Sequence, residues 1–329
     1  MLTRCPRIIV QPRDGVPPVL DLISQAHTSL LVKQFTFSEN SLLEAVIERH
    51  RAGVDVRVML NAKRSGGDRA NDETFARLNK AGVPVRWSNP KFYVTHEKSI
   101  VVDQSAALIA TFNLCPKYFT HTRDYGIITS EPRQVAQIVE GFEADWEHRD
   151  WLPDPSTGLL WSNANSRARI CEFIDSARHS LDVQHPKFVD AVVLDRLLDA
   201  HHRGVRVRVL CGGRHGISDW DILDTFSSLR VLRRAGVKVH KQKNLRLHAK
   251  LLLADGLRAV VGSMNIDRSA FDLRRELGIA LDEPSAVRQL EEVFALDWDA
   301  SSHYDAPDPL DPSKHHEPEF PQDHDLRHE

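Results

Sequence analysis

Cysteine is scarce in this sequence, and the four residues present (Cys5, Cys115, Cys171 and Cys211) are widely separated. No two of them form a CxxC pair, and none has the Cys/His spacing of a zinc site. The sequence therefore predicts neither a disulfide framework nor a structural zinc site. Four scattered thiols fit a reducing compartment.

Long hydrophobic runs are also missing. No window approaches the roughly 18 consecutive apolar residues of a membrane-spanning helix, and the first residues contain too short an apolar run for a secretory signal. We therefore expect a cytoplasmic protein whose contact with a membrane, if it has one, is peripheral.

A strong excess of one charge is absent, since the net charge is −3. Residues 301–329 hold eight acidic and two basic residues, which leaves the rest of the chain at about +3. A dedicated nucleic-acid-binding protein usually has a larger basic excess, because phosphate neutralisation supplies most of its affinity. Residues 301–329 are acidic and rich in His and Pro, and apolar periodicity stops before them, so we expect a disordered tail.

What the sequence does contain is a doubled motif. A pattern of His-x-Lys, four residues and Asp, followed ten residues later by Asn, occurs twice, and each residue of the second copy lies 152 positions after its counterpart. At roughly 5% per specified residue, four fixed positions match by chance about once in 10⁵ starts, so two matches in one chain indicate a real repeat. The eight residues are His96, Lys98, Asp103, Asn113, His248, Lys250, Asp255 and Asn265.

The repeat extends over most of the chain. Segments with strand and helix periodicity alternate from Arg7 to Trp146 and restart after the Pro/Gly-containing stretch 151–158. The sequence predicts an α/β fold of two similar domains, residues 1–150 and 151–300, with a parallel or mixed sheet covered by helices in each. One active site at the interface of the two domains would use both motifs.

The motif chemistry suits a phosphate group. His and Lys separated by one residue leave the same face of a strand, and the ammonium of Lys and the amide of Asn donate to phosphate oxygens. Two copies facing each other would place two His, two Lys and two Asn around one phosphodiester. No metal ion or other cofactor is needed for this arrangement.

Two histidines at one phosphate suggest covalent catalysis, in which one neutral imidazole attacks phosphorus and the other, protonated, supplies a proton to the leaving oxygen. Asp124 and Glu276 lie 28 residues after His96 and His248, respectively. A carboxylate that accepts from the second ring nitrogen would fix the tautomer of each His. The alternative is that these carboxylates form surface salt bridges with neighbouring arginines, namely Arg123, Arg274 or Arg275.

Other motif residues are expected to support the site. Asp103 and Asp255 end apolar runs, and we expect them to hydrogen-bond the turn that follows. Thr111 and Ser263 lie two residues before the motif asparagines and are also assigned a supporting role.

At this point the sequence resembles the phospholipase D superfamily, whose motif is HxKxxxxD followed by a GSxN element. The second copy matches it in full, including Gly262 and Ser263, whereas the first copy has Ala110 and Thr111 in place of Gly-Ser. The resemblance implies two α-β-α sandwich domains related by pseudo-twofold symmetry, a phosphohistidine intermediate and no metal requirement. It also implies that His96 is the nucleophile and His248 the general acid.

The favoured substrate class is phospholipid, acted on by a phospholipase D or a phosphatidyltransferase that resembles cardiolipin synthase. Aromatic residues beside the motifs would line an acyl-chain groove, unless they belong to the core: Phe92, Tyr93, Phe112, Tyr118 and Phe119. No obligate protein partner is expected, because one chain holds both motifs.

Two other functions stay open. The superfamily includes nucleases, and a run of basic residues before His248 would suit single-stranded DNA or RNA: Lys238, Lys241, Lys243 and Arg246. A non-catalytic phosphate-binding protein is the third hypothesis, although both motifs are intact.

Overall fold

The protein is described by a computed structural model covering residues 5–214 and 217–315. The helices and strands of the first half follow in chain order: β1 (Arg7–Gln11), α1 (Pro17–Ser24), β2 (Ser29–Gln34), α2 (Asn40–Arg51), β3 (Asp55–Leu60), α3 (Asp72–Lys80), β4 (Val85–Trp87), β5 (Ser99–Val102), β6 (Ala106–Ala110), α4 (Pro116–Thr120), β7 (Thr122–Thr129) and α5 (Pro132–Trp146).

The second half repeats this series: η1 (Pro155–Thr157), β8 (Leu159–Trp161), α6 (Ser166–Asp175), β9 (Ser180–Gln184), α7 (Ala191–His202), β10 (Arg206–Cys211), η2 (Asp219–Asp221), α8 (Ile222–Arg234), β11 (Lys238–Lys241), β12 (Arg246–Leu247), β13 (Leu251–Ala254), β14 (Arg258–Gly262), α9 (Arg268–Asp272), β15 (Leu277–Leu281), α10 (Pro284–Asp299), β16 (Ser302–His303) and η3 (Pro312–Lys314).

The two sheets have the same strand order. The first is β1-β7-β6-β5-β2-β3-β4, and the second is β8-β15-β14-β13-β9-β10-β11 with β16 added beyond β11. In each sheet three parallel strands (β2, β3 and β4, or β9, β10 and β11) continue into antiparallel ones. The predicted α/β fold of two halves with pseudo-twofold symmetry is therefore confirmed.

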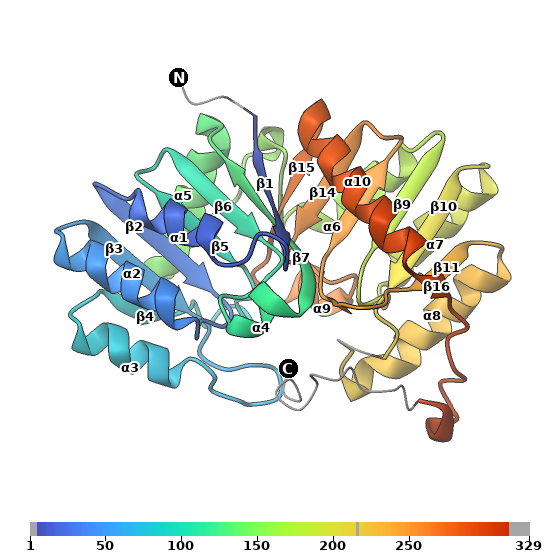
Figure 1. Cartoon of the computed structure of the whole chain (residues 1–329), viewed down its shortest axis with the longest axis horizontal. Coiled ribbons are helices and arrows are strands. Elements are labelled where there is room, and N and C mark those ends of the chain that lie inside the picture. The colour runs from blue at the N-terminus through green and yellow to red at the C-terminus, as the bar shows by residue number, and fades with distance from the viewer. Residues whose placement is uncertain (1–4, 215–216, 316–329) are drawn as a thin grey trace.

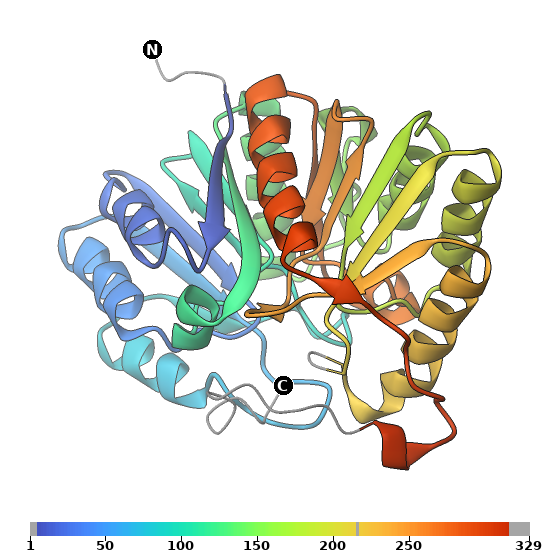
Figure 2. The same cartoon turned by 45° about the vertical axis from the view of Figure 1, so that its right-hand side comes forward.

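Helices cover both faces of each sheet (Figures 1 and 2). The outer faces carry α1, α2 and α3 on the first sheet and α6, α7 and α8 on the second, each group packed on its own hydrophobic core. A third core lies between the sheets, where Ile127, Val261 and Ile279 are fully buried together with residues of α5 and α10. Apolar runs such as SLLV in β2 are buried on both faces, as expected for central strands.

The two sheets are joined by exchanged strand segments. β12 belongs by sequence to the second half, yet it pairs in parallel with β7 of the first sheet. The symmetry-related contact is a parallel bridge between Thr95 and Arg275. Each motif histidine directly follows such an exchanged segment, so the pairing brings it against the other half.

Residues 301–315 differ from the disorder expected for the acidic tail. β16 pairs antiparallel with β11, and Ala306 is buried against the core of the second half, where Tyr304 also packs. The acidic composition of this stretch led to the prediction of disorder, although it contains an edge strand and two residues that contact the core. The rest of the expected tail, residues 316–329, lies outside the described residues.

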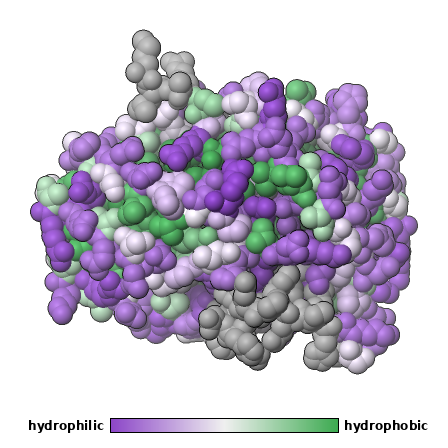
Figure 3. All heavy atoms as spheres, in the orientation of Figure 1, coloured by the Kyte–Doolittle hydropathy of each residue, from purple (hydrophilic) through white to green (hydrophobic). Residues whose placement is uncertain are grey.

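The surface is mixed rather than uniformly apolar. Figure 3 shows separate hydrophobic patches between hydrophilic residues on the face that carries α1, α2 and α10. Within residues 5–214 and 217–315, no helix is both long and apolar enough to cross a membrane.

Candidate functional site

The two His-x-Lys segments lie at equivalent places, directly before the central strands β5 and β13. In both, the lysine ammonium turns back and donates to the backbone carbonyl of the histidine two residues earlier. The distance is 2.6 Å from Lys98 Nζ to His96 O and 2.6 Å from Lys250 Nζ to His248 O. Lys250 Nζ also lies 3.1 Å from Nε2 of His248. The spacing of the motif thus holds each ammonium against the backbone of its histidine.

Each histidine is paired with a carboxylate from the other half of the chain. Nδ1 of His96 lies 2.9 Å from Oε2 of Glu276, and Nδ1 of His248 lies 2.7 Å from Oδ1 of Asp124. Both carboxylates are fully buried. The sequence predicted that each histidine pairs with a carboxylate. It did not predict that the carboxylate comes from the other half, because both histidines are followed by a carboxylate after the same 28 residues.

The alternative interpretation of Asp124 and Glu276 as partners in surface salt bridges is wrong. Asp124 accepts hydrogen bonds from the hydroxyls of Thr111 (2.5 Å) and Thr122 (2.6 Å) as well as from His248. In the second half the backbone N–H of Leu277 donates to Ser263 Oγ over 3.1 Å, just as that of Tyr125 donates to Thr111. Thr111 and Ser263 therefore lie against the strands that carry the carboxylates.

Two of the three arginines expected as surface partners, Arg123 and Arg275, instead form largely buried ion pairs, here called clasps, between the halves. Arg123 binds Asp297 of α10 through two N–H groups (2.7 and 2.9 Å), and Arg275 binds Asp145 of α5 in the same way (2.8 and 2.6 Å). Their backbone carbonyls accept the N–H of His248 (3.2 Å) and His96 (2.9 Å), respectively. Sequence reasoning missed these pairs, although both members of each are displaced by the repeat interval.

The Arg275–Asp145 clasp has two further buried charges beside it. Lys33 Nζ donates to Asp145 (2.8 Å) and to Glu97 (3.0 Å), and all three side chains are at most 2% exposed. Glu97 lies between His96 and Lys98 in the chain, so this network fixes the backbone of the first motif. The strand register makes Gln184 and Ala249 the counterparts of Lys33 and Glu97 in the second half. Gln184 donates to Asp297 over 2.7 Å, as Lys33 does to Asp145, but the buried charges of Lys33 and Glu97 are not repeated.

Electrostatics favour neutral imidazoles in the free site. Burial lowers the pKa of His96 well below its usual value, and the charges of Lys98 and Lys250 lower it further. Burial also lowers the pKa of His248, to about 4, although the charge of Asp124 acts in the opposite direction. The two motifs are therefore not equivalent, because the positive form of His248 is the better stabilised.

The pKa values of the two carboxylates are shifted in opposite directions. Burial disfavours ionisation of Asp124, but the charge of His248 and its hydrogen bond outweigh it, and the pKa of Asp124 is lowered. Burial raises the pKa of Glu276 to about 7, even though Lys98 and Arg274 oppose the shift. Burial lowers the pKa of Lys250 to about 8.

The motif asparagines lie in the loops after β6 and β14. The amide oxygens of Asn113 and Asn265 are buried and have no hydrogen-bond partner among the described residues. A buried polar atom without a partner costs free energy, which a ligand or water would recover. Both asparagines thus carry unsatisfied polar groups beside the motifs.

Asp103 and Asp255 bond a different segment from the one predicted. Asp103 accepts from the backbone N–H groups of residues 27–29, which precede β2, and Asp255 accepts from residues 178–180, which precede β9. The prediction of the following turn was wrong. β2 and β9 run antiparallel to β5 and β13, so the start of each lies beside the aspartate at the end of its neighbour. Burial disfavours the charge of Asp103, but these donors hold its pKa at about 2.

The aromatic residues proposed for an acyl groove are mostly core. Phe112, Tyr118 and Phe119 are buried in the outer core of the first half, and Tyr118 packs on the ring of His248 with centroids 4.9 Å apart. Phe92 stacks under the guanidinium of Arg275 at 4.5 Å. Tyr93 alone of the five is exposed.

The basic run before His248 does not form one loop. Lys238 and Lys241 lie in β11, Arg246 lies in β12, and Lys243 is exposed between the two strands. The four basic residues are therefore spread over two strands and the loop between them.

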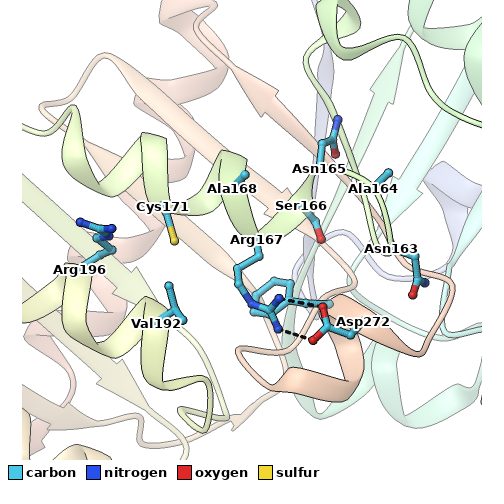
Figure 4. A pocket seen from close by; sticks show the side chains of 11 residues that line it. Asn163, Ala164, Asn165, Ser166, Arg167, Ala168, Cys171, Val192, Arg196 and Asp272 are labelled. Carbon is cyan, nitrogen blue, oxygen red and sulfur yellow. Dashed lines mark hydrogen bonds and ion pairs between the residues drawn. The ribbon is translucent and has the colours of Figure 1, made fainter.

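Within the described ranges, no cluster of three or more His, Cys, Asp or Glu side chains is placed to hold a metal ion. A separate cavity of about 600 Å³ lies between α6, α7 and α9 (Figure 4). Arg167 crosses it to bind both oxygens of Asp272 at 2.7 Å. The cavity is lined by none of the predicted site residues.

Comparisons with known proteins agree with this geometry. The model of the cardiolipin synthase phospholipase D-like domain matches the chain twice, over residues 19–146 and 170–298. Cardiolipin synthase from Clostridium perfringens is 26% identical over 298 residues, which cover 78% of this chain and 61% of that protein. The chain thus spans about three fifths of the length of this relative.

Two solved structures share the fold. Polyphosphate kinase from Porphyromonas gingivalis has a TM-score of 0.74 and 16% identity, covering 93% of this chain and 49% of that one. Phosphatidylserine synthase from Haemophilus influenzae has a TM-score of 0.71 and 12% identity, covering 92% and 88%. With the doubled motif, the shared strand order and the twofold family match, the chain belongs to the family of phospholipase D-like domains found in cardiolipin synthase.

Proposed function

We propose that the protein is a phosphatidyltransferase or phospholipase D that acts on phospholipids through a covalent phosphohistidine, without a metal ion. The observation that carries the proposal is the crossed pair of His–carboxylate contacts with a lysine beside each histidine. The names of the relatives, cardiolipin synthase and phosphatidylserine synthase, support a phospholipid substrate.

In the first step His96 is the nucleophile. Its Nδ1–H donates to Glu276, which leaves the lone pair of Nε2 to attack phosphorus. The N–P bond forms as the bond from phosphorus to the leaving oxygen breaks. Lys98, Lys250 and the motif asparagines surround the phosphoryl oxygens and stabilise their negative charge.

His248 acts as the general acid in the same step. Asp124, held ionised, stabilises the imidazolium of His248, and the negative charge of a bound phosphodiester raises the pKa of this histidine from its low value in the free site. The leaving oxygen takes the proton from Nε2. His248 is then neutral and ready to act as a base.

The second step restores the protein. Water or an alcohol gives its proton to His248 while its oxygen attacks phosphorus, and the N–P bond to His96 breaks with its electron pair returning to Nε2. Water as acceptor gives hydrolysis, and an alcohol gives phosphatidyl transfer. The acceptor therefore decides between phospholipase and synthase activity.

The decisive experiment compares purified protein on phosphatidylglycerol vesicles and on single-stranded DNA, with His248→Ala as control. We expect turnover of the lipid that the substitution reduces by about 10² to 10⁴. Turnover of DNA alone would overturn the lipid assignment in favour of a nuclease. Loss of activity in EDTA with recovery on adding a divalent cation would overturn the metal-free mechanism.

A further inference from the structure

Arg274 belongs to neither clasp, although the sequence places it beside a motif carboxylate. It lies between α9 and β15, directly before Arg275. Its backbone carbonyl accepts from the Ser162 hydroxyl over 2.6 Å, and the same hydroxyl accepts from the N–H of Glu276 over 2.7 Å. The backbone of Arg274 is therefore held in one hydrogen-bonded unit with the carboxylate that orients His96.

The side chain of Arg274 faces the site. Successive residues of an extended segment point to opposite sides. Arg275 points to Asp145 of α5, whereas Glu276 points to His96, so the side chain two residues before Glu276 shares its side. The electrostatics agree with this direction. Burial dominates the pKa values of Glu276 and His96, raising the first and lowering the second, and the charge of Arg274 lowers both.

The guanidinium of Arg274 lies near other charged groups of the site without bonding to them. Burial is the largest influence on the pKa of Lys250 and of Asp267, and the charge of Arg274 lowers both values. Within residues 5–214 and 217–315 the guanidinium makes no hydrogen bond and no ion pair, and its Nε is buried without a partner. A buried donor without an acceptor costs free energy, which a bound anion would recover.

The first half has no such cation. The residue 152 positions before Arg274 is Thr122, whose hydroxyl donates to Asp124 over 2.6 Å. There the residue two positions before the carboxylate helps to orient it. Arg274 makes no hydrogen bond to Glu276, so this role does not explain the arginine. The site thus has an additional cation on the side of His96 only.

A guanidinium beside the nucleophilic histidine is suited to phosphoryl oxygens. Arginine presents a planar pair of N–H donors that binds two oxygens of a phosphate at once. In an in-line displacement, attack by His96 places the leaving oxygen on the side of His248. The oxygens nearest to Arg274 are then those that stay on phosphorus after the leaving group departs.

We propose that Arg274 is a third phosphate-binding cation of the site, which binds the non-bridging oxygens of the phosphoryl group on the side of His96 and stabilises them in the covalent intermediate. This inference rests on the proposed function. It adds to the two motif lysines a catalytic residue that the repeated motif does not contain.

The first test measures binding of inorganic phosphate to the full chain by titration calorimetry. Arg274→Thr is the main variant, because it introduces the side chain that the first half has at the equivalent position and should therefore fold. Arg274→Lys keeps the charge but not the paired donors. The matched control is Arg268→Ala, which removes an arginine of α9 whose side chain is 88% exposed.

We expect the Kd for phosphate to rise by about tenfold to a hundredfold in Arg274→Thr, since a hydrogen bond to a charged group contributes that much. Arg274→Lys should lie between this variant and the unaltered protein, and Arg268→Ala should bind phosphate normally. Equal phosphate binding by Arg274→Thr and the unaltered protein, or an equal loss in the control, would overturn the proposal.

The second test separates contact with substrate from a structural role. In Arg274→Ala we expect kcat for a phosphodiester to fall by about 10² to 10³, as for loss of one donor to a developing oxyanion. Added guanidinium, at concentrations far below those that unfold proteins, should restore part of the rate. It should not restore His96→Ala. A rate for Arg274→Ala that is unchanged, or lowered and not restored by guanidinium, would count against contact with the phosphoryl group.

The proposed function fails separately. If Arg274→Thr weakens phosphate binding but the unaltered protein processes no phosphodiester, the phosphate-binding role stands and the enzymatic assignment falls. If the unaltered protein processes phospholipid and Arg274→Thr does so equally well, the role of Arg274 falls and the enzymatic assignment stands.

Discussion

The carboxylate of Glu276 lies 2.9 Å from Nδ1 of His96, although the two residues are 180 positions apart and belong to different halves of the fold. The same exchange joins Asp124 to His248 at 2.7 Å. Because of this crossing, each histidine is oriented by the half that does not carry it. The site therefore exists only when the halves are packed together.

The roles of the two histidines can be separated with an activated substrate. A nitrophenyl phosphodiester has a leaving group that needs no protonation, so His248→Ala should still release one equivalent of nitrophenolate in a burst. His96→Ala should give no burst, because the nucleophile is missing. Rapid-quench absorbance measures both.

The control is to test for base-stable phosphate on the His248→Ala protein after the burst. Because phosphohistidine survives alkali, its presence would show that the burst forms the covalent intermediate. A burst from His96→Ala and none from His248→Ala would reverse the assignment.

A second fall of activity at alkaline pH should be set by Lys250. Its pKa is lowered to about 8 by burial, and a lysine loses its positive charge above its pKa. Because kcat/KM reports the free protein, we expect it to fall above about pH 4, where His248 loses its proton, and to fall more steeply above about pH 8. In Lys250→Arg the charge persists, so the steeper fall should move to higher pH while the maximum rate drops. A pH–rate profile with the same steep fall in both proteins would refute this assignment.

Glu276 should make the protein less stable as pH rises. Its pKa of about 7 in the folded state exceeds the ordinary value of 4.5, so between these values the folded state holds more protons than the unfolded state. The free energy of unfolding then falls as pH rises from about 5 to 8, by about 3 kcal/mol from this residue.

The Glu276→Gln protein should lack that component of the pH dependence. Urea unfolding gives the loss of unfolding free energy between pH 5 and pH 8 for each protein. The contribution of Glu276 is the loss in the unaltered protein minus the loss in Glu276→Gln. Equal losses of stability in the two proteins would show that Glu276 is ionised throughout.

Breaking the two clasps should lower the free energy of unfolding by different amounts. Arg123→Leu leaves Asp297 buried, and among the described residues only the side-chain amide of Gln184, at 2.7 Å, still donates to it, so we expect a loss of about 4 kcal/mol. Arg275→Leu should cost less, because Lys33 still binds Asp145 at 2.8 Å.

Chemical unfolding of the clasp variants checks the order. The control is Arg133→Leu, which removes an exposed pair with Asp154 and should change stability by less than about 0.5 kcal/mol. A smaller loss for Arg123→Leu than for Arg275→Leu would contradict the predicted role of Lys33.

Much of the fold could be predicted because its residues repeat. The apolar runs that form β2 and β9, and the helix after Pro132, follow local periodicity, and the repeat interval doubles each assignment. β16 was missed because it pairs through its backbone, and its sequence, Ser302–His303, has no strand periodicity.

The residues of the site could also be listed from sequence, but not their pairing. Asp124 follows His96 by the same 28 residues that separate His248 from Glu276, so the spacing does not say which carboxylate binds which histidine. Only the packing of the two halves brings His96 to Glu276. Lys33 and Glu97 gave no signal, because their counterparts, Gln184 and Ala249, are uncharged and neither residue belongs to a local motif. Burial of charges is a property of tertiary structure.

The exchange of β12 into the first sheet has a dynamic consequence. Many proteins built of two lobes admit substrate by swinging about a hinge, which requires few bonds across the boundary. Here the backbone pairing of Leu247 with Arg123 and the buried clasps cross it on both sides. We therefore expect the two sheets to move as one unit, so that a substrate reaches the paired histidines without a hinge opening between the halves.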